Sequence, residues 1–233
     1  MSVPGLVSAH LPLATALSLA LVAAAGCTGN LLHSDAKPEQ TYVLRAPPAA
    51  TAGSDGAVAT AAPTAAPLAP VQVAHPLAAP GLDGPHIILV QADRRMNFYL
   101  GSRWPAPLPD MLEAMAVETL RASGEWQSVQ DSGSPFTSEY LLQISVRRFE
   151  ADYTRSRSAP QVEVVLDCTL GARAGRELVA SFEAQGSATA AGDRMSEVVA
   201  AFETAASAAL GSMSQQTVAA TRAFAGRGTA TAH

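Results

Sequence analysis

Histidine and cysteine are scarce in this chain, which has five histidines and two cysteines among 233 residues. Within the segment that we predict to fold, His86 is the sole histidine, so a Ser-His-Asp or Cys-His catalytic site would depend on that imidazole. It follows Pro85 at the start of an apolar run, which favours a residue at a strand edge over a catalytic base. The sequence also lacks G-x-S-x-G, H-E-x-x-H and Gly-rich phosphate-loop motifs. These absences argue against a hydrolase and predict no metal and no cofactor, although carboxylate chemistry stays open.

Basic clusters are absent as well. The chain has 15 Lys and Arg against 20 Asp and Glu, which gives a net charge of −5. Because a protein that follows nucleic-acid phosphates needs a basic patch, this balance argues against nucleic acid as a partner. The cysteine count limits crosslinking: if Cys27 is modified, as predicted below, Cys168 has no partner for an intramolecular disulfide.

Charged side chains are missing from the first 26 residues. Residues 11–25 form an apolar run of 15 residues. A membrane-spanning helix needs about 20, whereas this length is typical of a signal peptide. Small residues follow directly before Cys27, and AAGC resembles the lipobox of bacterial lipoproteins. Two departures are Ala24, where leucine is commonest, and the lack of Lys and Arg in the first ten residues.

We therefore predict that residues 1–26 are a lipoprotein signal peptide and that Cys27 carries acyl chains such as palmitate, which hold the protein on a membrane. Residue 28 is Thr rather than Asp. By resemblance to proteobacterial sorting rules, this favours the outer membrane, with the protein facing the periplasm. The alternative is an ordinary signal peptide followed by an incidental cysteine.

Residues 46–80 contain almost only Ala, Pro, Thr, Gly and Val, with one charge at Asp55 and no aromatic residue. Such a composition cannot bury enough apolar surface to offset the entropy of ordering. We expect residues 27–80 to be the lipidated N-terminus and an Ala/Pro-rich linker, which would set the reach of the domain. We expect residues 81–220 to fold as one domain and residues 221–233 to be a disordered tail.

Hydrophobic periodicity predicts the strands of this domain. Residues 86–91 are a short apolar run typical of a buried strand, and residues 96–100 and 126–130 are weaker candidates. Three strands with a period of two follow, over residues 140–146, 162–170 and 178–183. Short polar links join these three, which favours antiparallel pairing. Their apolar and polar faces predict a sheet that is covered on one side.

Two helices complete the prediction. Asp110 and Glu113 resemble a capping box, and apolar residues continue along one face until Gly124. A second helix over residues 193–218 has an Ala-rich apolar stripe that allows close packing on a sheet. The order of elements predicts an α/β fold, in which a mixed, largely antiparallel sheet packs with two main helices in a single domain. Whether both helices lie on one face of the sheet stays open.

One group of side chains suggests a binding surface, and it comprises Arg94, Arg95, Phe98, Tyr99, Arg103 and Trp104. Arginines near aromatic rings are typical of interfaces and could meet lipid phosphates. The alternative, which we favour, is that Trp104 caps the core and the arginines are solvated. Cys168 has apolar neighbours and is expected to be inert. Glu113 and Glu118 are expected to be solvated helix charges, and we predict no catalytic residue.

Four features together resemble one family. They are Tyr42-Val43-Leu44 after the predicted anchor, the block YLGSRWPAPLPDMLEAMAVETLRASGEWQSV from Tyr99, the strand YLLQISVRRFEADY followed by VEVVLDCTL, and the Ala-rich C-terminal helix. In these the chain is similar to the ABC-type transport auxiliary lipoproteins, the PqiC-like partners of MCE-type intermembrane lipid transport systems. The insert between Leu44 and Gly81 is longer than the family's usual connection, and the place of residues 42–44 in the sheet stays open.

The resemblance implies an α/β fold, an outer-membrane anchor and a role beside a transporter, and it carries over no catalytic residue. We therefore expect a lipid-anchored subunit that is not an enzyme. It would dock on a periplasmic partner, which the resemblance implies to be an MCE-domain protein or the ABC transporter complex. The alternatives are a lipoprotein that assists the assembly of another envelope machine and, less favoured, a periplasmic hydrolase.

Overall fold

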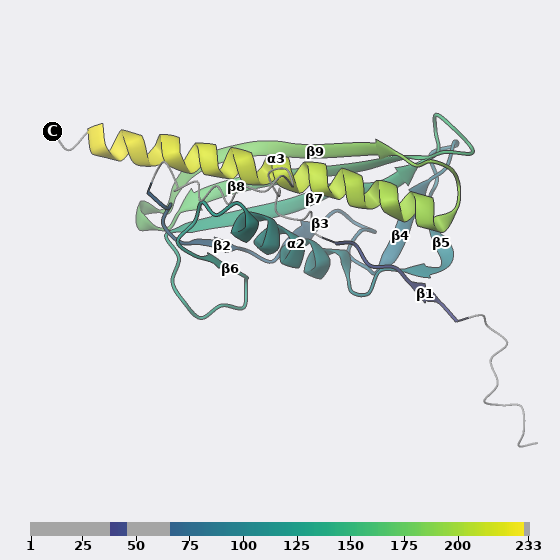
Figure 1. Ribbon diagram of the computed structural model, residues 1–233, viewed down its shortest axis with the longest axis horizontal. Helices are drawn as coiled ribbons and strands as arrows, with labels where there is room; N and C mark the ends of the chain where they lie inside the picture. The colour runs from purple at the N-terminus through teal and green to yellow at the C-terminus, as the bar shows by residue number, and fades with distance from the viewer. Residues whose placement is uncertain (1–37, 46–65, 231–233) are drawn as a thin grey trace, which may run out of the picture. The chain divides into compact units, whose positions relative to one another are not determined.

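The computed structural model describes residues 38–45 and 66–230, with side chains as far as residue 227. Its strands are β1 (Gln40–Thr41), β2 (Val71–Val73), β3 (Leu77–Ala78), β4 (His86–Val90), β5 (Met96–Arg103), β6 (Val129–Gln130), β7 (Tyr140–Asp152), β8 (Gln161–Ala172) and β9 (Glu177–Thr189). Its helices are α2 (Leu108–Ala122) and α3 (Met195–Ala230), with a 3-10 turn at Ala174–Arg176. Within the described residues, these strands form one mixed sheet (Figure 1), so the predicted α/β class with two main helices is confirmed.

Strand β7 is the axis of the sheet. On one side it pairs antiparallel with β8, which in turn pairs antiparallel with β9, as the period of two in these segments predicted. On its other side β2, β3 and β4 pair with successive stretches of β7, and all three run parallel to it. Strand β5 pairs antiparallel with β4, and β1 pairs parallel with the end of β5. The strands β1, β4 and β5 therefore lie together at one end of the sheet (Figure 1).

Both helices lie on the same face of the sheet, which the sequence had left open (Figure 1). The side chains of β7 and β8 alternate between this buried face and the opposite one, here called the open face. Trp104, Phe149 and Phe202 join the end of β5, the C-terminal part of β7 and helix α3 in one ring cluster, with centroids 5.2 to 6.1 Å apart. Trp104 is thus a core residue, as the favoured interpretation predicted.

Helix α3 approaches the backbone of β9 closely at Gly186. A Cβ atom built on this residue would lie 2.1 Å from the carbonyl oxygen of Ala205 and 2.7 Å from the amide nitrogen of Ala209. Real Cβ atoms essentially never approach another atom so closely, so this contact requires glycine. The small buried side chains of Ala205 and Ala209 allow the helix to approach this near, as its Ala-rich stripe predicted.

The predicted N-terminal boundary of the domain at residue 81 is wrong. Strands β2 and β3 fall inside the range assigned to the linker, and Val71 and Val73 are fully buried. Further upstream, β1 pairs with β5 and Leu44 is buried in the core. The cause is pairing with distant strands, which supplies backbone partners that the local Ala/Pro composition does not indicate.

Two predicted helix limits are also wrong. Helix α3 continues to Ala230, beyond the tail boundary at residue 221, because Phe224 packs edge-on against Tyr140 with ring centroids 6.5 Å apart and Arg222 pairs with Glu125. Helix α2 begins at Leu108 with no side-chain cap, so the predicted capping box does not form. The carboxylate of Glu113 is bound elsewhere, as described below.

Candidate functional site

The segment that follows the predicted anchor is held on the edge of β5. Cys27 lies outside the described residues, so its acylation stays a prediction. Gln40 and Thr41 pair with Ser102 and Arg103, and the amide of Tyr42 donates to the carbonyl oxygen of Arg103 at 2.9 Å. A lipid on Cys27 would therefore be joined to the sheet through residues 28–39, and not through the Ala/Pro-rich segment that follows Arg45.

The turn between β4 and β5 carries the two neighbouring arginines. The amide of Gln91 donates to the carbonyl oxygen of Arg95, and Arg94 has a positive φ of 66°, as a tight turn requires. The Nε of Arg95 lies 2.6 Å from an Asp93 carboxylate oxygen. No ion pair forms with Arg94 in the part of the chain whose side chains are described.

The structure separates the rest of the predicted arginine and aromatic cluster. Trp104 is in the core, and Arg103 lies at the far end of β5, where it pairs with Glu39 at 3.5 Å. Phe98 pairs with Ile88 and remains half exposed on the open face, whereas Tyr99 turns towards the helix face. The six residues do not form one surface, and only the hairpin turn with the adjoining part of β5 is left as a candidate.

A chain of hydroxyl groups fixes the helix-facing side of the hairpin. Tyr99 and Tyr153 have their hydroxyl oxygens 2.8 Å apart, and Tyr153 donates to the carboxylate of Asp193. Burial and this hydrogen bond to Asp193 raise the pKa of Tyr153 to about 12, and burial also raises the pKa of Tyr99. The three groups line an open pocket of about 380 Å³ with Leu89 and Arg157, and they tie β5, the end of β7 and the start of α3 together.

A second polar contact involves a histidine that the sequence had assigned to the linker. His75 Nδ1 lies 2.9 Å from a carboxylate oxygen of Glu113, whose other oxygen accepts the amide of Ser132 at 2.7 Å. Glu113 is only 9% exposed, so its predicted role as a solvated charge is wrong. Burial raises the pKa of this carboxyl, but the hydrogen bonds from Ser132 and His75 outweigh that effect and lower it. The cluster fastens helix α2 to the chain on both sides of it.

The remaining residues with potential nucleophilic or basic character are held in structural contacts. Cys168 is fully buried, its thiol lies 4.0 Å from the carbonyl oxygen of Leu166, and burial raises its pKa to about 12. A thiol in this state is a poor nucleophile, as predicted. His86 is exposed and stacks on Phe98 with ring centroids 4.7 Å apart.

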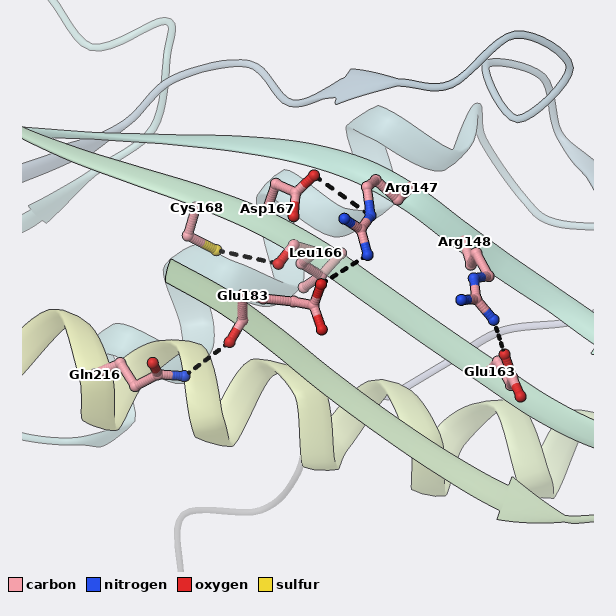
Figure 2. Close-up of polar contacts among 8 residues, drawn as sticks. All are labelled: Arg147, Arg148, Glu163, Leu166, Asp167, Cys168, Glu183 and Gln216. Carbon is pink, nitrogen blue, oxygen red and sulfur yellow. Dashed lines mark hydrogen bonds and ion pairs between the residues drawn. The ribbon is translucent and has the colours of Figure 1, made fainter. Parts of the chain in front are cut away.

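The open face of the long strands carries paired charges. Arg147 of β7 lies 3.4 Å from Asp167 of β8 and 2.6 Å from Glu183 of β9, as Figure 2 shows. Arg148 pairs with Glu163 on the same strands. Exposed pairs of this kind contribute little to the free energy of unfolding, and their charges make this face of the sheet polar.

The described residues contain no group of three or more His, Cys, Asp or Glu side chains that could hold a metal ion. None of the described helices is long and apolar enough to cross a bilayer.

The sequence matches a known family model over residues 53–214, which is more than half of its length. The family is described as the ABC-type transport auxiliary lipoprotein component. The chain belongs to this family, as the sequence features predicted. The description associates the protein with an ABC-type transport system and, as a lipoprotein, with a membrane of the cell envelope, and it names no enzymatic activity.

Solved structures agree with this assignment. A Xanthomonas campestris protein of family DUF330 is 28% identical and superposes with a TM-score of 0.63, covering 68% of this chain and 88% of that one. A crystal structure of an uncharacterized protein, 16% identical, has a TM-score of 0.50 and covers 66% of this chain and 91% of that one, which shows a likeness of fold alone. No curated protein sequence matches the chain.

Proposed function

We propose that this protein is held by a lipid on Cys27 at the periplasmic face of the outer membrane and acts there by docking. Its partner in this proposal is the MCE-domain protein or the ABC transporter complex of an intermembrane lipid transport system. The observation that carries the proposal is the pairing of Gln40 and Thr41 with β5. Because these residues follow so soon after Cys27, the domain of an auxiliary lipoprotein family would begin almost at the anchor.

The number of residues between Cys27 and β1 limits how far the domain can lie from the membrane. Residues 28–39 separate Cys27 from β1, and a fully extended chain spans at most about 3.5 Å per residue. The start of β1 would therefore stay within about 45 Å of the bilayer surface. A partner that docks on this domain must itself reach close to the membrane, as a component that bridges two membranes would.

Docking is favoured over catalysis by the state of the reactive groups. His75 is bound to a carboxylate, His86 stacks on a ring, and Cys168 is sealed in the core. Among the described residues, His86 and Cys168 have no hydrogen bond to a group that would activate them, and the Glu113 carboxylate that holds His75 also accepts the amide of Ser132, which makes this pair a structural contact of helix α2. Two alternatives remain to be tested: a lipoprotein that assists another envelope assembly, and a periplasmic hydrolase.

The anchor is tested by Cys27→Ser, with Cys168→Ala as the matched cysteine control. Metabolic labelling with palmitate should mark the wild type and the control but not the Cys27 variant, which should leave the membrane fraction. Equal labelling of all three proteins would disprove the anchor.

The docking role is tested by crosslinking in native membranes followed by purification of the protein. We expect recovery of MCE or transporter components with the wild type and a large loss with Cys27→Ser. Recovery of a different envelope machine would favour the first alternative. His86→Ala should leave recovery and envelope integrity unchanged, and a loss of function in a His86→Ala protein that melts normally would favour the hydrolase.

A further inference from the structure

Strand β5 contains a large bulge beside β1, the strand through which the chain enters the sheet after the predicted anchor. His86 pairs with Arg103 and Ile88 pairs with Phe98, so residues 99–102 of β5 lie opposite the single residue Ile87 of β4. Extra residues on one strand bend it and push side chains out of the ladder. Leu100, in this bulge, is 86% exposed.

The bulge adjoins further exposed apolar side chains. Met96 and Phe98 are 48% and 46% exposed, and with Leu100 they form what we call the bulge surface. Three large exposed apolar side chains within five residues of one strand are unusual for a surface that meets only water, because exposed apolar side chains that gather in one region usually mark a contact.

The edge of β5 is poorly suited to accept a strand from a protein partner. Strand β1 already occupies the edge at Ser102 and Arg103. Next to it, Gly101 has a positive φ of 69°, which interrupts the extended backbone that a partner strand would need. Strand addition is therefore disfavoured.

Position and charge point instead to a bilayer. The N-terminal end of β1 pairs with Ser102, two residues from Leu100, so a chain anchored at Cys27 enters the fold beside the bulge. In the hairpin turn that precedes Met96, Arg94 has no ion pair among the described side chains. Apolar side chains flanked by a cation suit the boundary between acyl chains and phosphate groups.

We propose that the bulge surface rests in the headgroup region of the phospholipid bilayer that carries the anchor, with Leu100 inserted towards the acyl chains and Arg94 beside lipid phosphates. This contact rests on the proposed anchoring at Cys27, and it adds a defined orientation to it. The end of the sheet with β1, β4 and β5 then faces the membrane, and the opposite end, with the β8–β9 turn, faces the periplasm (Figure 1).

The test places a tryptophan in the bulge. Leu100→Trp is compared with Leu178→Trp, whose leucine is 61% exposed at the start of β9. Both full-length acylated proteins are reconstituted in vesicles of phosphatidylethanolamine and phosphatidylglycerol that contain brominated phosphatidylcholine. Trp104 and Trp126 are buried, and their emission is subtracted by using the wild type. Emission from position 100 should be quenched several-fold more than emission from position 178, and equal quenching would overturn the proposal.

A second measurement separates the bulge from the anchor. If the wild type does not enter vesicles, the anchor has failed, and the bulge is then judged from the Cys27→Ser chain by co-sedimentation with a large excess of vesicles that lack the brominated lipid, because the bulge alone should bind too weakly to keep the chain in the membrane fraction of cells. Leu100→Glu should weaken this sedimentation about tenfold, because it removes one buried leucine, whereas Leu178→Glu should not. Absence of this difference counts against the proposal. If Leu100→Glu instead lowers recovery of transporter components while quenching at position 100 matches that at 178, the surface belongs to a protein partner.

Discussion

Replacing Gly186 by alanine tests the contact that seats α3 on the sheet. The new Cβ would meet the carbonyl oxygen of Ala205 at 2.1 Å, the amide nitrogen of Ala209 at 2.7 Å and the Cβ of Ala208 at 2.9 Å. Two of these atoms belong to the helix backbone, so no change of side-chain rotamer can relieve the clash. The helix, or the strand, must move.

The size of the effect follows from the distances. Carbon and oxygen atoms rarely approach closer than about 3.3 Å, so α3 must retreat by roughly 1 Å from β9. Overpacking of this kind costs about 1–3 kcal/mol, and the better strand geometry of alanine returns at most about 1 kcal/mol. We expect a net loss of about 2 kcal/mol in the free energy of unfolding and a fall of roughly 4–8 °C in Tm.

The assay is urea and thermal unfolding of the Cys27→Ser chain, followed by circular dichroism. The matched control is Gly171→Ala on the neighbouring strand β8, where the nearest atom to the new Cβ, the carbonyl oxygen of Glu177, is 3.6 Å away. This control should be neutral or slightly stabilising. If Gly186→Ala unfolds at the same urea concentration as its parent, α3 does not lie on β9 as described.

Three further predictions concern polar groups that are wholly or partly buried. Glu113→Ala should lower the free energy of unfolding by about 1–3 kcal/mol at neutral pH, because Ser132 and His75 lose their acceptor. Since the pKa of Glu113 is held below 4.5, this loss should shrink as the pH falls below that value, as urea unfolding at two pH values would show. Tyr153, with its pKa raised to about 12, should stay protonated near pH 11. Its contribution to the free energy of unfolding should be full below about pH 10 and should disappear as the pH rises through about 12. An ultraviolet titration compared with that of Tyr153→Phe would detect this. Cys168, in the chain without Cys27, should resist Ellman's reagent at about pH 8 in the native state and react stoichiometrically in urea, and rapid native labelling would contradict its burial.

The sequence was informative where periodicity was long. Strands β7 and β8 repeat their apolar residues with a period of two over many positions, and α3 has a continuous apolar stripe, so the presence and type of these elements were predicted, although β7 and α3 extend further than expected. On β9 the pattern misplaced Leu178, because a register shift beside Gly171 turns this residue to the solvent. A bulge of this kind moves a side chain to the other face of the sheet and leaves no mark in the alternation of residue types.

The parts that the sequence missed depend on distant partners. Strand β2 has only three residues, too few to show a period, and it is fixed by pairing with β6 and β7. His75 follows it, so the Ala/Pro composition also concealed the contact with Glu113. In β5, by contrast, Gly101 was a readable signal, because an isolated glycine within a strand pattern often marks a bulge.

These omissions change how the distance to the membrane is understood. The Ala/Pro-rich segment was expected to separate the folded domain from Cys27, and its length would then have set the reach. In the structure, Leu44 lies just before this segment and is buried, while Leu68 lies within it and pairs with Trp126. The chain is thus attached to the same sheet at Leu44 and again at Leu68. The length of the residues between these two points does not affect the distance between the sheet and Cys27, which lies upstream of both. With a lipid on Cys27, the reach would be set by residues 28–39, which would hold the bulge of β5 close enough to the bilayer for a second, weaker contact beside the lipid.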